Sequence, residues 1–237
     1  DSNLTSINNA MKPLDTDNQA HAQAQIQQLV VSYNNILNYA ADSSTSSAPI
    51  ADDFSNIGVD DVTQDAQAIS LLNDVIALGD KSAVDTIAKL QALMAAVTSV
   101  LNLPEGQIDT LSKQQLELLG VEGVTDDNLL AIREMITSDN QAMDKLRDIQ
   151  GIVDKVVASH KIQAYSANSS NNSIPTLDDY KTIGLTDFIQ ADIDQVNSMI
   201  KQKDALDIDN IAKIIALLTA DTDGDSTADI FDSFPHD

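Results

Sequence analysis

The chain has 237 residues, of which 43% are hydrophobic and only 3% aromatic, and its 37 acidic and 13 basic side chains give a formal net charge of −24. A field of that sign repels phosphate groups, so the composition argues against nucleic acid and anionic membrane surfaces as partners. The lack of cysteine excludes disulfide and thiolate chemistry, and no apolar run approaches the roughly 20 residues of a membrane-spanning helix, so no membrane insertion is predicted.

A short phrase, a glycine between two aliphatic residues, recurs along the chain and defines a repeat. Its copies are Ile57-Gly58-Val59, Leu119-Gly120-Val121 and Ile183-Gly184-Leu185, spaced 62 and 64 residues apart. Each copy is followed by aliphatic residues three and four positions apart, which predicts helices with one buried face. We therefore predict an all-α fold, a tandem array of small three-helix bundles that ends in an irregular calcium-binding loop.

The period divides the chain into modules. We predict a partial module of two helices over 1–42, three-helix modules over 49–103, 104–165 and 174–220, and an acidic loop over 221–237. The Ser- and Asn-rich segments 43–49 and 166–175 have the composition of flexible linkers. The joint at 103–106 is much shorter, so we expect rigid coupling of the two middle modules and more flexible outer joints.

The first helix of each module is short and is bounded by residues that cap helices. Thr176 with Asp179 predicts a capping box, and Ser112 with Gln115 occupies the same place in the preceding module. In module 49–103 the hydroxyl is replaced by Ile50, although acidic residues still follow in the first turn. The glycine of the repeated phrase ends each first helix, so that the second helix can fold back beside it.

The second and third helices carry longer aliphatic stripes. Thr63 and Thr125 predict the starts of two second helices, and Ser82 with Asp85 predicts the start of the third helix of module 49–103. The stripes of the second helices are Ile69, Leu72 and Val75, then Leu129, Ile132 and Ile136, then Ile193, Val196 and Ile200. Those of the third helices begin at Ile87, Leu146 and Ile211.

The order of a short helix, a glycine turn, a second helix and a longer third helix resembles the three-helix albumin-binding (GA) modules of bacterial surface proteins. The matching stretches are 57–93, 119–152 and 183–217. The resemblance implies a three-helix fold and, as an alternative function, specific binding of a protein through the second and third helices. The albumin-binding positions correspond to 64–67, 126–129 and 189–192, which carry Asp and Gln in place of aromatic anchors, so we take only the fold from it.

The strongest chemical spacing lies near the carboxyl end of the chain. Carboxylates fall at positions 1, 3, 5, 9 and 12 of a twelve-residue loop, and position 7 offers a carbonyl. Calcium takes six to eight oxygen ligands in a flexible geometry, and a loop that turns at Gly224 can supply that many. We therefore predict a Ca²⁺ site formed by Asp221, Asp223, Asp225, Thr227, Asp229 and Asp232.

The residues after this loop, Ser233-Phe234-Pro235-His236-Asp237, are similar to the thrombospondin type 3 repeats of secreted and cell-surface proteins. The resemblance implies that calcium stiffens the joint to a following domain. We expect a fragment of a large extracellular or cell-surface bacterial protein that acts as a spacer, stalk or adhesion scaffold, with an extracellular protein ligand of unknown identity as the alternative. Because no nucleophile, phosphate-binding or zinc-hydrolase motif occurs, we do not predict an enzyme.

Overall fold

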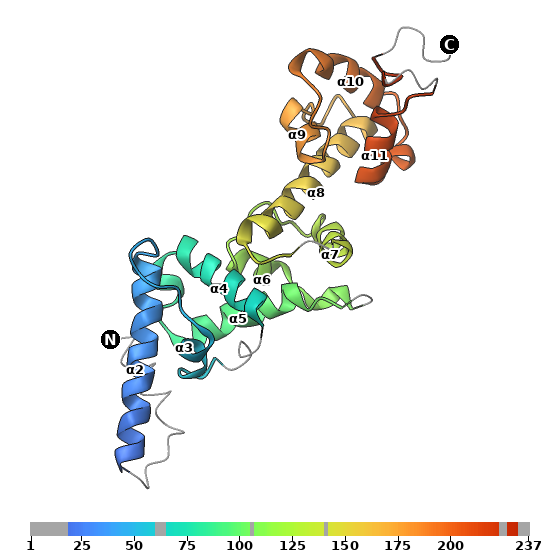
Figure 1. Cartoon of the computed structure of the whole chain (residues 1–237). Helices are drawn as coiled ribbons and strands as arrows, with labels where there is room; N and C mark the ends of the chain where they lie inside the picture. The colour runs from blue at the N-terminus through green and yellow to red at the C-terminus, as the bar shows by residue number, and fades with distance from the viewer. Residues whose placement is uncertain (1–18, 60–64, 105–106, 140–141, 223–226, 232–237) are drawn as a thin grey trace. The chain divides into compact units, whose positions relative to one another are not determined.

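The computed structural model describes residues 19–59, 65–104, 107–139, 142–222 and 227–231. Within these ranges the regular elements are ten α-helices and several short 3₁₀ turns, and none is a strand (Figure 1). The predicted all-α fold is therefore confirmed. No helix in this part of the chain combines the length and the hydrophobicity that crossing a membrane requires.

The chain divides into two compact units, residues 1–150 and 151–237. The first unit contains α2 (Gln19–Ala41), α3 (Ala51–Ser55), α4 (Ala66–Leu78), α5 (Ile87–Leu101), α6 (Lys113–Leu118) and α7 (Leu129–Ser138). Helix α8 (Leu146–Ala167) begins in the first unit and ends in the second, which also contains α9 (Leu177–Thr182), α10 (Ile193–Ile200) and α11 (Ile211–Leu218). This division is coarser than the predicted modules 49–103, 104–165 and 174–220, whose boundaries stay predictions.

The short helices α3, α6 and α9 begin where the sequence predicts. Before α6 the backbone N–H of Ser112 donates to the side chain of Gln115 at 2.8 Å, and the N–H of Gln115 donates to the Ser112 hydroxyl at 3.2 Å. Thr176 and Asp179 form the same capping box before α9. Before α3 only half of the box forms, because the side chain of Ile50 has no acceptor atom, and the N–H of Ile50 donates to Asp53.

The repeated glycine ends each short helix, as predicted. Gly58, Gly120 and Gly184 adopt φ values of +79°, +90° and +112°, which residues with a Cβ atom rarely adopt. The N–H of the residue after each glycine turns back to a carbonyl of the short helix at 3.0 Å, as between Leu185 and Tyr180. This closure satisfies carbonyls that the helix end would otherwise leave exposed.

The second helices begin later than the predicted caps: α7 begins at Leu129, four residues after Thr125, and α4 begins at Ala66, three residues after Thr63. Thr125 accepts a hydrogen bond from the N–H of Asn128 at 3.3 Å and donates its own N–H to the Asn128 side chain at 2.7 Å, just before α7. Helix α4 is capped by Asp65, whose side chain accepts the N–H of Gln67 at 2.9 Å. Thr63 lies outside the described residues.

The predicted start of the third helix at Ser82 and Asp85 is wrong. Helix α5 begins at Ile87 and is capped by Thr86, whereas Ser82 lies in the 3₁₀ turn η2 (Lys81–Ala83). The physical reason is that Asp80 accepts the N–H of Ser82 at 2.7 Å and caps η2, while Thr86 accepts the N–H of Lys89 at 3.3 Å and caps α5. The ammonium group of Lys89 also donates to the carbonyl of Ser82 at 2.7 Å and pairs with Asp85 at 2.8 Å.

The same arrangement recurs at the start of α11 in the second unit. Asn210 caps this helix, and the ammonium group of Lys213 donates to the carbonyl of Leu206 at 2.9 Å and pairs with Asp209 at 2.8 Å. A lysine three residues after the cap therefore ties the preceding turn to the third helix in both modules.

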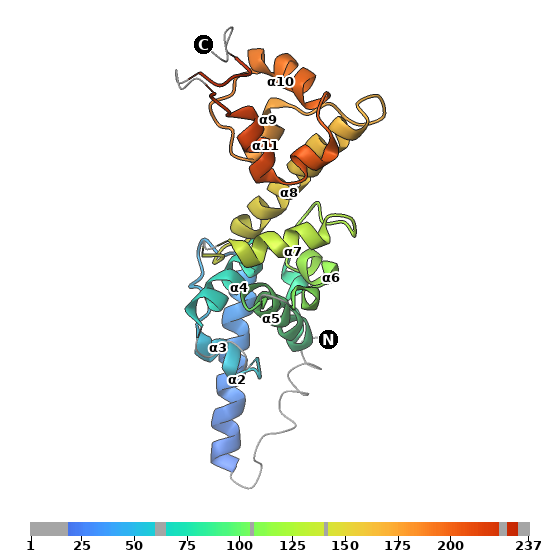
Figure 2. The same ribbon diagram turned by 90° about the vertical axis from the view of Figure 1, so that its right-hand side faces the viewer.

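The core of the second unit is formed by the end of α8 together with α9, α10 and α11 (Figure 2). Its largest fully buried side chain is Tyr180. The buried members are Ala158, Ile162, Tyr165, Tyr180, Ile183, Leu185, Phe188, Ile193, Val196, Ile200, Ile208, Ile214, Leu218 and Ile230. The last of these comes from the acidic loop, which thus contributes to the core.

The segments with linker composition begin as hydrogen-bonded turns. After α2, the N–H of Ser46 donates to the carbonyl of Asp42 at 3.2 Å, and the Ser46 hydroxyl donates to Asn38. After α8, the side chain of Asn172 donates to the carbonyls of Ala164 and Asn168 at 2.8 and 2.9 Å. Each segment is therefore fastened to the helix that it follows, and the flexibility of the outer joints stays a prediction.

Candidate functional site

One hydrogen bond is repeated in each of the three predicted three-helix modules, and we call it the latch. The residue that follows the central aliphatic residue of the second helix donates its side chain to the carbonyl just before the first-helix cap. The latch pairs are Asn73 with Pro49 at 2.8 Å, Arg133 with Leu111 at 2.7 Å, and Asn197 with Pro175 at 3.0 Å. The repeat therefore extends beyond the aliphatic pattern to a specific polar contact between the first two helices.

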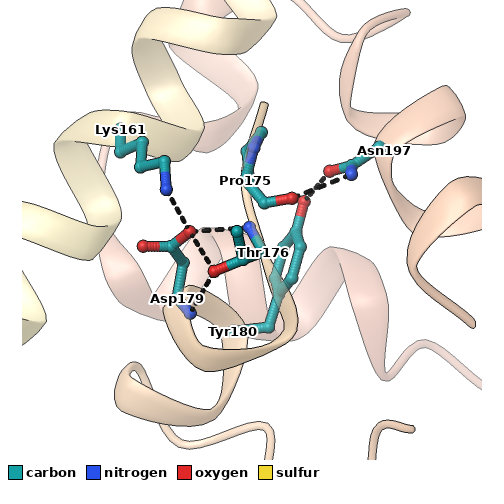
Figure 3. Close-up of polar contacts among 6 residues, drawn as sticks. All are labelled: Lys161, Pro175, Thr176, Asp179, Tyr180 and Asn197. Carbon is teal, nitrogen blue, oxygen red and sulfur yellow. Dashed lines mark hydrogen bonds and ion pairs between the residues drawn. The ribbon is translucent and has the colours of Figure 1, made fainter. Parts of the chain in front are cut away.

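The latch of the last module uses both ends of an amide (Figure 3). Asn197 donates from Nδ2 to Pro175, and its Oδ1 accepts the hydroxyl of Tyr180 at 2.7 Å. Burial raises the pKa of the Tyr180 hydroxyl, so this group stays protonated and donates. Both polar atoms of a buried side chain are thus satisfied, which avoids the cost of an unpaired amide.

In the other two modules the tyrosine hydroxyl is missing from the latch. Phe54 occupies the place of Tyr180 in module 49–103, and Asn73 Oδ1 is buried without a partner among the described residues. In module 104–165 the place is taken by Leu116, and the latch residue is Arg133, whose side chain has no acceptor to satisfy. The guanidinium also pairs with Asp109 at 3.0 Å. Only the first of these arrangements leaves a polar atom unpaired.

A second repeated contact joins each short helix to the long helix that precedes it, and we call it the joint bond. The two partners come from equivalent positions, but the long helix donates in the first and third pairs and accepts in the second. The pairs are Asn35 with Asp53 at 3.1 Å, Gln115 with Ser99 at 2.6 Å, and Lys161 with Asp179 at 2.6 Å. Each long helix is therefore bound to the capping residue of the next module.

The joint bond of α8 and α9 is electrostatically the strongest (Figure 3). Asp179 Oδ2 accepts from Lys161, from the N–H of Thr176 at 2.6 Å and from the Thr176 hydroxyl at 2.8 Å. Burial alone would raise the pKa of this carboxyl, but these hydrogen bonds and the positive charge of Lys161 outweigh it and lower the pKa below its ordinary value. One carboxylate thus holds both a helix cap and a contact between helices.

A third repeated contact places the glycine turn against the third helix of its own module. Gln91 donates to the carbonyl of Gly58 at 2.9 Å, and Gln150 exchanges two hydrogen bonds with the backbone of Glu122. At the equivalent position of the last module Ile215 packs against Gly184, where a Cβ atom would lie 3.8 Å from its side chain. The turn is therefore held by polar contacts in two modules and by an aliphatic contact in the third.

The predicted calcium ligands lie only partly within the described residues. Asp221, Thr227 and Asp229 are described, whereas Asp223, Asp225 and Asp232 are not. Asp229 accepts the N–H of Thr222 at 2.7 Å and its hydroxyl at 2.6 Å, which closes the base of the loop. The described part of the chain contains no group of three or more acidic or histidine side chains placed to hold a metal ion, so the calcium site stays a prediction.

The end of the acidic loop is anchored to the second unit, which the sequence did not lead us to expect. Ile230 is buried in the core, and its carbonyl accepts a hydrogen bond from the side chain of Gln195. The ring of Phe231 meets that of Phe188 edge to face, with centroids 5.4 Å apart. The only sequence signal for this anchoring is an adjacent pair of large apolar residues in an otherwise polar stretch.

A hollow of about 290 Å³ lies within the first unit and has a largely aliphatic lining. Val75 and Leu93 contribute to its wall, and Leu78 and Leu118, which are 68% and 45% exposed, lie at its edge. The equivalent positions in the other modules are polar. Ser138 and Gln202 correspond to Leu78, and Asn56 and Thr182 correspond to Leu118. This exposed aliphatic patch is therefore a feature of one place and not of the repeat.

Comparisons of the chain with protein-family models, with curated proteins and with solved structures find no match. The relation to GA modules and to thrombospondin type 3 repeats thus stays a resemblance. The functional argument rests on the repeated contacts and on the chemistry of the loop.

We predict opposite effects of adding and removing the tyrosine hydroxyl at the latch. Phe54→Tyr gives Asn73 Oδ1 a donor and raises the free energy of unfolding by about 1 kcal/mol, whereas Tyr180→Phe leaves Asn197 Oδ1 unpaired and lowers it by about 1–3 kcal/mol. Urea unfolding followed by circular dichroism measures both. A destabilising Phe54→Tyr substitution contradicts the equivalence of the two positions.

We also predict that Asp179 contributes to the acid stability of the second unit. Because its pKa is lower in the folded than in the unfolded chain, the stabilisation is complete above about pH 4 and is lost as the pH falls through the folded pKa. Asp179→Asn should flatten the acid limb of the unfolding free energy plotted against pH. Asp178→Asn, on the exposed side of the same helix, is the control and should leave that limb unchanged.

Proposed function

We propose that this chain is a non-catalytic repeat region that acts as a spacer or adhesion scaffold in the extracellular part of a bacterial surface protein. The observation that supports it is the latch, which recurs at equivalent positions in the three predicted modules. Catalytic sites are assembled from unlike residues at one place, whereas a contact repeated along a chain builds a structure of like units. The latch is such a contact, because it joins the first two helices of each module.

The surface of the modules supports a scaffold over a repeated binding module. A binding function shared by the repeats requires an exposed apolar patch at equivalent positions. The patch at Leu78 and Leu118 has polar residues at the equivalent places, so the modules share their internal contacts and do not share this patch. The net charge of −24 gives them a strongly hydrated exterior.

We further propose that the acidic loop binds Ca²⁺ through Asp221, Asp223, Asp225, Thr227, Asp229 and Asp232, and that calcium rigidifies the carboxyl-terminal joint. The spacing of the oxygen ligands carries this proposal. The contacts of Ile230 and Phe231 add a route by which binding stabilises the second unit, because ordering the loop also orders residues that pack in its core.

One observation favours the alternative, a protein-binding module. The hollow edged by Leu78 and Leu118 is a place where an apolar side chain of a partner could be buried. This reading predicts one binding site in the first unit, not one site per repeat.

Binding experiments distinguish the two functions. Serum albumin and a panel of immobilised extracellular host proteins should show no saturable binding to the whole chain if it is a scaffold. The matched variant is Leu78→Gln with Leu118→Thr, which installs the residues found at the equivalent places of the last module. Saturable binding that this variant abolishes would overturn the scaffold proposal in favour of the alternative.

Calcium binding is tested by calorimetric titration of the whole chain. We expect heat of binding, and we expect the midpoint of thermal unfolding of the second unit to rise with calcium and to fall again with a chelator. Asp223→Ala and Asp225→Ala should abolish both effects, while Asp178→Asn should not. A titration without heat and without a change in the unfolding midpoint refutes the site.

A further inference from the structure

Helix α5 has buried residues along its whole length, and they cover about half of its circumference. With 3.6 residues per turn, Ile87, Leu90 and Met94 lie towards one side of this buried arc, Leu93, Ala96 and Val100 lie towards the other side, and Val97 lies between them. The first set belongs mainly to the amino-terminal half and the second to the carboxyl-terminal half. This arc is wider than the stripe of about 100° that a helix facing one core buries.

The two sides correspond to two neighbours within the first unit. Helix α5 contacts α4 of its own module and α6 of the next. Two side-chain hydrogen bonds add to these contacts: Gln91 donates to the carbonyl of Gly58, in the glycine turn of the same module, at 2.9 Å, and Gln115 of α6 donates to Ser99 at 2.6 Å. The helix therefore forms part of the wall of both modules.

A second connection between the same modules lies at the start of α8. The carboxylate of Asp74 on α4 accepts the N–H of Leu146 at 2.8 Å, and the hydroxyl of Ser70 reaches Asp144 at 3.4 Å. A free N–H at the beginning of a helix normally needs a cap from its own segment. Here the cap comes from a residue 72 positions earlier, so the start of α8 depends on α4.

We propose that α3 to α7 and the start of α8 in the first unit unfold as one cooperative structure, coupled through α5 and Asp74, and that the separate modules implied by the sequence period do not unfold alone. Loss of α6 exposes the second side of α5, and a 15-residue helix that loses half of its packing is only marginally stable in water. Helix α4 then loses its neighbour in turn. This inference rests on the contacts alone and holds whether the chain is a scaffold or a binding module.

Native-state hydrogen exchange of the whole chain tests the coupling. Leu116→Ala removes a fully buried side chain from α6, a change that speeds exchange limited by the opening of that structure by at least about thirtyfold. We expect the same acceleration at the amides of Leu71 and Leu72 in α4, although neither residue belongs to the altered module. If these amides keep their original exchange rates while those of α6 accelerate, the modules are independent and the proposal is wrong.

Two further variants complete the experiment. If Leu116→Ala does not fold, Leu116→Val carries the same comparison with an expected acceleration of about fivefold. Leu218→Ala makes the matched change in α11 of the second unit and should leave exchange in α4 unchanged. An equal acceleration of α4 by Leu218→Ala would place the coupling elsewhere than in α5 and would overturn the assignment.

Discussion

Each module depends on a hydrogen bond from its second helix to the carbonyl that precedes its first helix. Helices α3, α6 and α9 have only five or six residues, and isolated helices of that length are not stable in water. They persist because other parts of the chain satisfy both of their ends. The capping residue and the glycine turn act locally, and the latch ties the incoming chain to the second helix. The latch adds to the packing of the fully buried central side chains Phe54, Leu116 and Tyr180, which hold the short helices on the core.

The parts of this design that lie within a few residues of one another could be predicted from the sequence. Gly58, Gly120 and Gly184, and the boxes begun by Ser112 and Thr176, are local signals with a clear physical reason. The wrong helix start at Ser82 and Asp85 shows how neighbouring polar residues compete for the same role. Asp80, Ser82, Asp85 and Thr86 can all cap a helix, and only the structure shows that Asp80 caps η2 and Thr86 caps α5.

Contacts between elements far apart in the sequence could not be predicted. Arginine is usually a surface residue, yet the side chain of Arg133 is only 14% exposed and forms a latch. The joint-bond residues are an amide, a hydroxyl and an ammonium group at equivalent places, so residue type alone does not reveal that they share a role. For the acidic loop, the spacing of the carboxylates predicts calcium ligands. The packing of Ile230 and Phe231 could not be predicted, because it depends on the core of the second unit.

Helix α5 contacts the helices of two modules. The segment of sequence that repeats is therefore not the same as the segment that folds together. A stretch of one period contains one long helix, one short helix and one second helix, whatever residue it begins with. Inserting such a stretch therefore adds a long helix together with the short and second helices that cover its buried face. The array can lengthen or shorten by whole periods without leaving an aliphatic face bare, while a cut at the apparent boundary near residue 103 would strip α5 of half its cover.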